Sequence, residues 1–184
     1  MVETTAPTRR SGLAELTMPG HALAAVRVSP ARQRWIFRGG DEAARACGAS
    51  FGVALPDLAC RAATADDRAA LWLGPDEWLL LAPEGAPAPT PHAVLPGSLV
   101  DVARRQLGLE IRGAGAARLL NAHVLLNLDA GAFPPGAVAR TIFAKAEIVL
   151  WRRADDLFHI EAGRSFAPYV VGLLAEACRG QKLI

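Results

Sequence analysis

The most constraining feature of this 184-residue sequence is a repeat, because landmarks of its first half return in the same order in its second half. The run FRGGDEAAR at 37–45 returns as IRGAGAAR at 111–118, one residue shorter. Each half also contains one Leu-Trp pair, which ends at Trp72 in the first half and at Trp151 in the second. A polar turn and an apolar stretch follow each pair. Ordered matches at nearly constant spacing predict two similar modules. We therefore expect Trp72 to superpose on Trp151, and the arginines that close the two runs to superpose on each other.

Each half also shows the same order of predicted elements. A strand that ends at Arg-Gly leads into a short alanine-rich helix, and a hairpin with a polar turn follows. Asp41 and Ser165 are suited to cap the first and the last helix. The predicted strands are about 35–37, 70–73, 78–81, 107–111, 147–151 and 157–161, and the predicted helices are about 41–48, 114–123 and 165–178.

The predicted fold is of the α+β class, with two similar βαββ-type modules whose sheets are antiparallel. Residues 1–20 are expected to form a mobile N-terminal arm. Residues 21–184 are expected to form a single domain built of two similar halves, about 21–97 and 98–184. Segment 84–91 carries three prolines, which forbid a long helix there, so a loop is expected in its place.

Composition excludes several classes of protein. Hydrophobic residues make up 52% of the chain and charged residues 21%, which is not the composition of a disordered protein. The net charge of +2 predicts no nucleic-acid or anionic-membrane partner. Three widely spaced cysteines fit a reducing compartment, and the sequence shows neither a signal peptide nor an apolar run long enough to span a membrane. The chain is therefore expected to be cytoplasmic.

No catalytic, cofactor-binding or metal-binding residue is predicted. The four histidines share no ligand spacing, neither GxGxxG nor GxxxxGK occurs, and no GxSxG elbow is present. Cys178 is expected to be a core or interface residue rather than a nucleophile. His159 is expected to be an ordinary sheet residue. The adjacent carboxylates at 66–67, 76–77 and 155–156 are expected to be solvated turn residues, with Asp76 in an Asx-turn.

The aromatic and leucine residues of the hairpins are the predicted contact residues. On half-buried strands tryptophan is first of all part of the core, but it is also a frequent hot spot in interfaces. Three consecutive leucines at 79–81 require cover on both faces of their strand, from the chain's own core on one side and from a helix or a partner on the other. The residues predicted as a possible subunit interface are Trp72, Trp78, Trp151, Leu79 and Leu81.

These landmarks resemble the sarcosine oxidase gamma-subunit family. The similar stretches are LWLGPDEWLL at 71–80, RGAGAARLLN at 112–121, RTIFAKAEIVLW at 140–151, and FHIE at 158–161 followed by RSFAPY at 164–169. The resemblance as a whole covers roughly residues 14 to 180. The resemblance implies a fold similar to the folate-binding domain of the glycine-cleavage aminomethyltransferase.

The resemblance also implies membership of a heterotetramer that converts sarcosine to glycine by oxidative demethylation. In such an enzyme the gamma subunit has no assigned catalytic residue. The alpha subunit is its main partner, and beta and delta subunits complete the complex. The implied cofactors are FAD, FMN, NAD, tetrahydrofolate and zinc, all held by other subunits.

Two further hypotheses stay open at this stage. One is a gamma-like subunit of a related N-methyl amino-acid dehydrogenase. The other is a free-standing folate-binding one-carbon protein, which would need an acidic residue isolated in an apolar strand to grip the pterin. No residue in the sequence convincingly plays that part.

Overall fold

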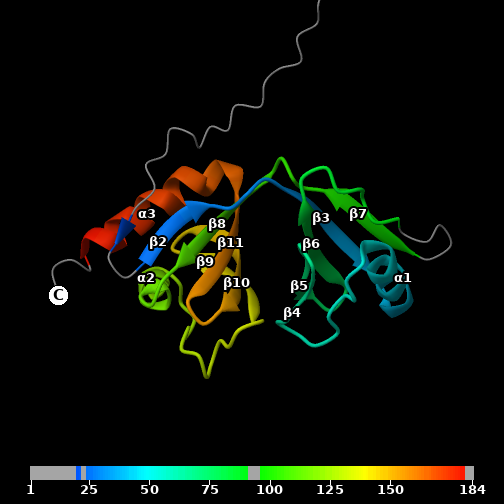
Figure 1. Cartoon of the computed structure of the whole chain (residues 1–184), viewed down its shortest axis with the longest axis horizontal. Helices are drawn as coiled ribbons and strands as arrows, with labels where there is room; N and C mark the ends of the chain where they lie inside the picture. Colours follow the sequence, from blue (N-terminus) through cyan, green and yellow to red (C-terminus); the bar gives the residue numbers. More distant parts are fainter. Residues whose placement is uncertain (1–19, 22–23, 91–95, 181–184) are drawn as a thin grey trace, which may run out of the picture.

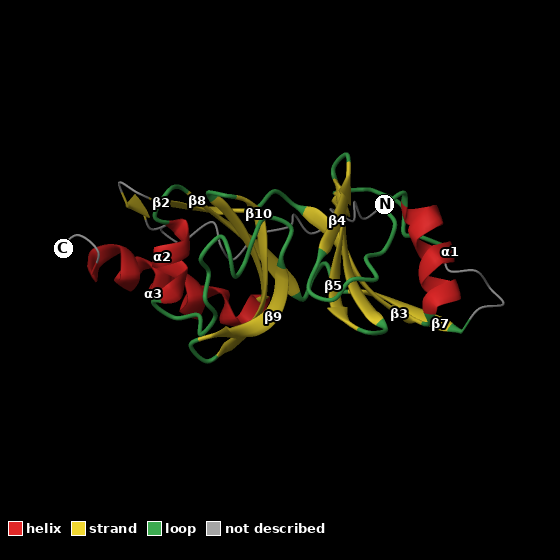
Figure 2. Ribbon diagram, turned by 90° about the horizontal axis from the view of Figure 1, so that it is seen from below, coloured by secondary structure: helices red, strands yellow, loops and turns green. Residues whose placement is uncertain are grey.

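The described residues, 20–21, 24–90 and 96–180, form two antiparallel β-sheets that face each other, with helices on the two outer sides. In this computed structural model the layers follow the order helices, sheet, sheet, helix (Figure 2). Figure 1 shows the same arrangement from the side, with α2 and α3 against one sheet and α1 against the other. The predicted α+β class with two antiparallel sheets is confirmed.

Each sheet has its own strand order. The six-stranded sheet has the order β1-β2-β8-β11-β10-β9, and the five-stranded sheet has the order β4-β5-β6-β3-β7. The bounds of the strands are β1 Gly20–His21, β2 Ala24–Val28, β3 Arg32–Gly39, β4 Ala62–Ala65, β5 Arg68–Gly74, β6 Glu77–Pro83, β7 Gly97–Asp101, β8 Gln106–Arg112, β9 Val138–Phe143, β10 Ala146–Ala154 and β11 Leu157–Gly163.

The two sheets are built alike but exchange one strand. The series β4-β5-β6-β3-β7 corresponds to β9-β10-β11-β8-β2, with an equivalent connection in each half. The exchange concerns the last strand of each series: β2, from the first half, pairs with β8, and β7, from the second half, pairs with β3. The chain therefore crosses twice between the sheets, once in each direction (Figure 1). The division of a single domain into halves near residue 97 stays a prediction.

The hairpin registers correct one detail of the expected superposition. Trp72 pairs with Trp78 in β5–β6, Arg152 pairs with Phe158 in β10–β11, and both ladders shift register just beyond these pairs. Arg152, not Trp151, is thus the equivalent of Trp72, and the predicted match is wrong by one residue. A one-residue shift on a strand moves a side chain to the opposite face. Trp72 accordingly packs on the α1 side, whereas Trp151 lies between the sheets.

The correspondence holds atom by atom at the hairpin turns. The amide of Gly39 donates to the carbonyl of Asp76 at 3.0 Å, and the amide of Gly113 donates to the carbonyl of Asp156 at 2.8 Å. The preceding arginine forms an ion pair with the same aspartate in each module, at 3.0 Å and 3.9 Å. The carboxylate of Asp76 therefore pairs with an arginine side chain instead of closing the expected Asx-turn on its own backbone.

The helices lie close to their predicted positions. They are α1 Asp41–Phe51, α2 Ala116–Asn121, the 3₁₀ turn η1 Arg164–Phe166 and α3 Ala167–Gly180. The N-cap of α1 is Gly40, and Asp41 is its first residue, so the predicted capping role of Asp41 is wrong. Ser165 lies inside η1, where the N-cap position is taken by Gly163 without a side-chain hydrogen bond.

One apolar stripe is what the sequence predicts for the last helix, made of Phe166, Tyr169, Val170, Leu173, Leu174 and Ala177. The residues that α3 buries are Ala167, Val170, Val171, Leu174 and Cys178. Phe166 and Tyr169 are exposed, so the buried face is rotated relative to the predicted stripe. The loop predicted in place of a helix is confirmed for residues 84–90, while the rest of that segment, like residues 1–19 of the predicted arm, lies outside the described residues.

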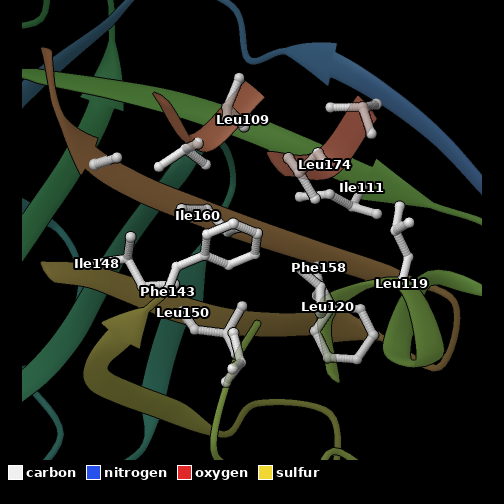
Figure 3. Packing of buried hydrophobic residues seen from close by; sticks show 14 of the residues in the cluster. Leu109, Ile111, Leu119, Leu120, Phe143, Ile148, Leu150, Phe158, Ile160 and Leu174 are labelled. Carbon is white, nitrogen blue, oxygen red and sulfur yellow. The ribbon is translucent and has the colours of Figure 1, made fainter. Parts of the chain in front are cut away.

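Three apolar clusters fill the spaces between the layers. The largest, under α2 and α3, joins side chains of β8, β10 and β11, such as Leu109, Leu150 and Phe158 (Figure 3). A second lies between α1 and the five-stranded sheet, and a third joins the facing surfaces of the two sheets. Leucines 79–81 are therefore covered on both faces by the chain itself, by α1 on one and by the second sheet on the other, without a partner. No helix in the described residues is long and apolar enough to span a membrane.

Candidate functional site

A large, mainly apolar groove lies beside α1. Its volume is about 990 Å³, and it runs between the helix, the loop that follows it and the turn of the β5–β6 hairpin. The helix ends because Gly52 adopts a left-handed conformation, with φ of 81°, which turns the chain back along the helix. Residues that line this α1 groove include Ala44, Arg45, Ala49, Val53, Leu55, Trp72 and Trp78.

The walls of the α1 groove are held by the side chain of Trp78. Its indole Nε1 donates to the carbonyl oxygen of Pro56 at 2.8 Å, which ties the loop after α1 to strand β6. Phe51, at the end of α1, packs edge-on against Trp35 with ring centroids 6.4 Å apart. A groove with fixed walls and an apolar lining can receive side chains from another protein.

The five predicted contact residues separate into two places. Trp72 is half-buried and lines the α1 groove, and Trp78 lines it from a more buried position. Leu79, Leu81 and Trp151 lie instead between the two sheets of the chain. A direct contact of those three with another subunit therefore has no exposed surface to act through, and the interface role of the five residues stays a prediction.

A buried polar cluster, formed by Arg34, His159 and Glu161, joins the two sheets. Nε of Arg34, on β3, donates to Oε2 of Glu161, on β11, at 2.7 Å. Nε2 of His159 lies 2.8 Å from Oε1 of the same carboxylate. All three residues are at most 5% exposed, so the ion pair of Arg34 with Glu161 is buried away from solvent. Such a pair is costly to break because each lone partner would be a buried charge.

The carboxylate of Glu161 is held in its ionised form. Burial alone raises its pKa, but the hydrogen bond and charge of His159 and the charge of Arg34 outweigh burial, so the pKa is lowered. An ionised carboxylate only accepts hydrogen bonds, so Nε2 of His159 carries the proton in their contact. Glu161 is the acidic residue within an apolar strand that was not recognised in the sequence, and its oxygens are engaged inside the chain.

Gly108 makes room for the polar cluster. It pairs with Glu161 across the β8–β11 ladder. A Cβ atom added there would lie 2.8 Å from Cβ of Ser29, 3.0 Å from Nη2 of Arg34 and 3.0 Å from Cε1 of His159. Real Cβ atoms essentially never lie under 3 Å from another heavy atom, so only glycine permits this approach without a shift of its neighbours. The arginine of one sheet therefore fits into a gap in the other.

Of the three cysteines, Cys60 is exposed, whereas Cys47 and Cys178 are buried. Burial raises the pKa of the Cys47 thiol to about 11, so it is not a thiolate near neutral pH. Cys178 is buried in the core, as predicted. No group of three or more His, Cys, Asp or Glu side chains in the described ranges is arranged to hold a metal ion.

Comparisons with known proteins agree on one family. The model of the "Sarcosine oxidase, gamma subunit family" matches residues 39–179. The sarcosine oxidase subunit gamma of Corynebacterium sp. (strain P-1) is 32% identical over 133 residues, which cover 70% of this chain and 66% of that subunit. The corresponding subunit of Arthrobacter sp. is 31% identical over 137 residues, which cover 72% and 68%. The matched stretches thus span about two thirds of each relative.

Solved structures extend the match in length. A chain of the heterotetrameric sarcosine oxidase from Corynebacterium sp. U-96, in complex with pyrrole 2-carboxylate, superposes with a TM-score of 0.84 and 27% identity. That superposition covers 94% of this chain and 95% of the other. The glycine cleavage system aminomethyltransferase T from Bartonella henselae superposes with a TM-score of 0.55 and 15% identity, covering 84% of this chain and 46% of that one. The second likeness concerns the fold alone.

Proposed function

Because the chain belongs to the sarcosine oxidase gamma subunit family, we propose that it is the gamma subunit of a heterotetrameric sarcosine oxidase. The observation that carries this proposal is the superposition on a chain of such an enzyme over nearly the whole length of both. The complex oxidatively demethylates sarcosine to glycine. The chain contributes binding surface to the complex rather than a reacting group.

The alpha subunit is the proposed main partner, within a complex that also holds beta and delta subunits. FAD, FMN, NAD, tetrahydrofolate and zinc belong to those other chains. A folate role for this chain is disfavoured by Glu161, whose carboxylate is already engaged by Arg34 and His159. No disulfide joins the cysteines at 47, 60 and 178 in the described part of the chain, which supports a reducing, cytoplasmic location.

We place the contact with the alpha subunit at the α1 groove. Its lining is mainly apolar and includes Trp72, with Asp41, Arg45 and Asp57 as its charged members. Aromatic residues in such hollows often dominate binding energy. In this arrangement Leu79, Leu81 and Trp151 act indirectly, because they fix the sheet that supports the groove.

The proposal is tested by co-expressing the chain with its neighbouring co-encoded subunits and purifying through a tag on this chain. The expected result is a complex with stoichiometric flavin and sarcosine-dependent oxidase activity. A chain that elutes without any flavin-bearing subunit would refute the subunit function. This outcome is independent of where on the surface the contact lies.

The place of the contact is tested by Ala49→Arg, a substitution at an exposed α1 position that lines the groove. We expect the recovered flavin to fall at least about tenfold, because a charged side chain would be buried against the partner. Ser50→Arg is the matched control, since Ser50 is the next exposed residue on α1 and does not line the groove. Equal recovery from both variants would move the interface elsewhere without touching the proposed function.

A further inference from the structure

A second hollow lies where the chain crosses between its two sheets. The two crossing segments are residues 29–31, between β2 and β3, and residues 102–105, between β7 and β8, and they meet at the top of the molecule in Figure 1. The hollow has a volume of about 250 Å³. We call it the crossover pocket, and its polar lining residues are Ser29, Arg32, Arg34, Gln106 and Arg164.

The charged residues that line the crossover pocket are all positive. Three arginines line it, and no Asp or Glu is found among its described lining residues. Arg34 is compensated by Glu161, which lies behind the pocket wall. Nη1 of Arg32 donates to a backbone carbonyl, that of Asp67, at 2.8 Å, and this bond adds no negative charge. Burial and the positive charges of Arg153 and Arg34 lower the pKa of Arg32, and the negative charges of Asp67 and Glu110 only partly offset this effect.

The pocket also contains a buried donor that has no partner. Ser29 is only 6% exposed, and its Oγ makes no hydrogen bond. Its amide donates to the carbonyl of Gly108 at 2.9 Å, which fixes the position of the residue. A buried hydroxyl without a partner costs free energy, so such a group in a native protein calls for an explanation.

Gly108 brings this hydroxyl-bearing residue and an arginine together. Its missing side chain leaves a gap in which Cβ of Ser29 and Nη2 of Arg34 both lie within 3.0 Å of the position a Cβ would occupy. Nε and Nη1 of Arg34 are engaged by Glu161 and by the carbonyl of Arg32, so Nη2 is the nitrogen on the Ser29 side. The amide of Arg164 donates to the carbonyl of Arg105 at 2.8 Å, which anchors a third cation at the rim.

We propose that the crossover pocket binds a small oxyanion, a phosphate or carboxylate group, with Ser29 and Arg34 as buried donors and Arg32 and Arg164 as outer cations. Guanidinium groups are the preferred partners of such anions because their planar N–H donors match two oxygens at once. A hydroxyl donor completes the set. The side-chain amide of Gln106, whose Oε1 is buried without a partner, presents N–H donors instead when the amide is turned over.

Because both crossing segments contribute to the crossover pocket, a bound anion would hold the two sheets together. This inference does not rest on the subunit function. It is tested on the purified full-length chain by thermal unfolding with increasing inorganic phosphate, against sodium chloride of equal ionic strength. A ligand that binds only the folded state raises the Tm in a saturable way. A parallel titration with acetate distinguishes a carboxylate from a phosphate site.

Two substitutions make the test specific. Ser29→Ala is expected to raise the phosphate dissociation constant about tenfold, because it removes a hydrogen bond to a charged ligand. Without phosphate the same variant should be at least as stable as wild type, since it removes an unpartnered buried hydroxyl. A merely structural serine would give the opposite result in the absence of phosphate.

Arg164→Gln should weaken phosphate binding without unfolding the chain. Arg104→Gln is its control, since Arg104 is exposed on the crossing segment and does not line the pocket. The proposal is supported by a saturable rise in Tm that both pocket variants reduce and the control retains. It is overturned if neither phosphate nor acetate exceeds chloride, or if the pocket variants respond as wild type does.

Discussion

The facing surfaces of the two hairpins share their register but not their chemistry. In β6 the residues that point toward the other sheet are Leu79 and Leu81, and at the equivalent positions of β11 they are His159 and Glu161. The middle strands differ in a complementary way, since Arg34 of β3 corresponds to Gly108 of β8. One sheet therefore presents an arginine among leucines, and the other presents a carboxylate beside a gap.

This difference shows how divergence between the two halves of an internal repeat can fix the way their sheets dock. Two identical apolar faces can slide over each other, because apolar contacts are non-directional. A single ion pair that fits a single gap permits one position. We infer that the polar cluster fixes the docking of the two sheets, a role of the kind known for isolated buried polar groups in other folds.

The largest expected effect comes from breaking the ion pair on one side. Arg34→Met should lower the free energy of unfolding by about 3–5 kcal/mol, because it leaves a buried carboxylate without its cation. The combination with Glu161→Leu, which copies the leucine of the other hairpin, should recover most of that loss. Urea denaturation of the single and double variants measures both quantities. If the double variant is less stable than Arg34→Met, the Arg34–Glu161 ion pair is not the part of the polar cluster that stabilises the chain.

An intermediate effect is expected from filling the gap. Gly108→Ala places a methyl group within 3.0 Å of three side-chain atoms, so it should cost about 1–3 kcal/mol through overpacking. Gly172→Ala is the matched control, because Gly172 lies in α3 with nothing near its Cβ position. That substitution should stabilise the chain by about 0.5–1 kcal/mol through helix propensity. Thermal unfolding that ranks the two variants the other way would contradict the fit of Arg34 into the gap.

The smallest expected effect is a pH dependence of the free energy of unfolding that arises from Glu161, in the second hairpin. Because the pKa of Glu161 is lowered in the folded state, its contribution to stability is present above the ordinary glutamate pKa of about 4.3 and is lost as the pH falls toward the folded value. The loss is at most about 1.4 kcal/mol per pH unit.

The comparison of wild type with Glu161→Gln isolates this contribution from the other carboxylates. The difference in their free energies of unfolding should narrow between about pH 5 and about pH 3, since only wild type carries the titrating group. Urea denaturation at each pH supplies the values. A difference that stays constant over this range would mean that folding does not lower the pKa of Glu161.

The sequence predicted the inner strands because their apolar patterns are local. The predicted stretches at 78–81 and 157–161 both lie within observed strands, β6 and β11. The exchanged strands β2 and β7 were not predicted. They are short, and what makes them strands is pairing with β8 and β3 of the other module, which no local pattern records.

The candidate sites show the same limit. The α1 groove itself was not predicted, but two predicted contact residues, Trp72 and Trp78, line it, and their interface role stays a prediction. Glu161 was missed as a buried group because its cation, Arg34, is 127 residues away in the sequence. One signal was available: a lone acid between Ile160 and Ala162, in a strand whose other residues are apolar or histidine up to its closing glycine. Trp72 and Trp151 were matched by residue type, whereas ladder pairing relates Trp72 to Arg152.

The exchange of β2 and β7 has a consequence for how the chain is made. During synthesis β2 leaves the ribosome well before β8, and β3 well before β7, so the earlier strand of each pair must wait for its neighbour. Strand edges left open during that delay are sites of aggregation. Long-range pairing also slows folding, because distant segments must meet before they stabilise each other. The first half is therefore a poor candidate for early, independent folding on the ribosome, and the native chain forms only when both halves have emerged.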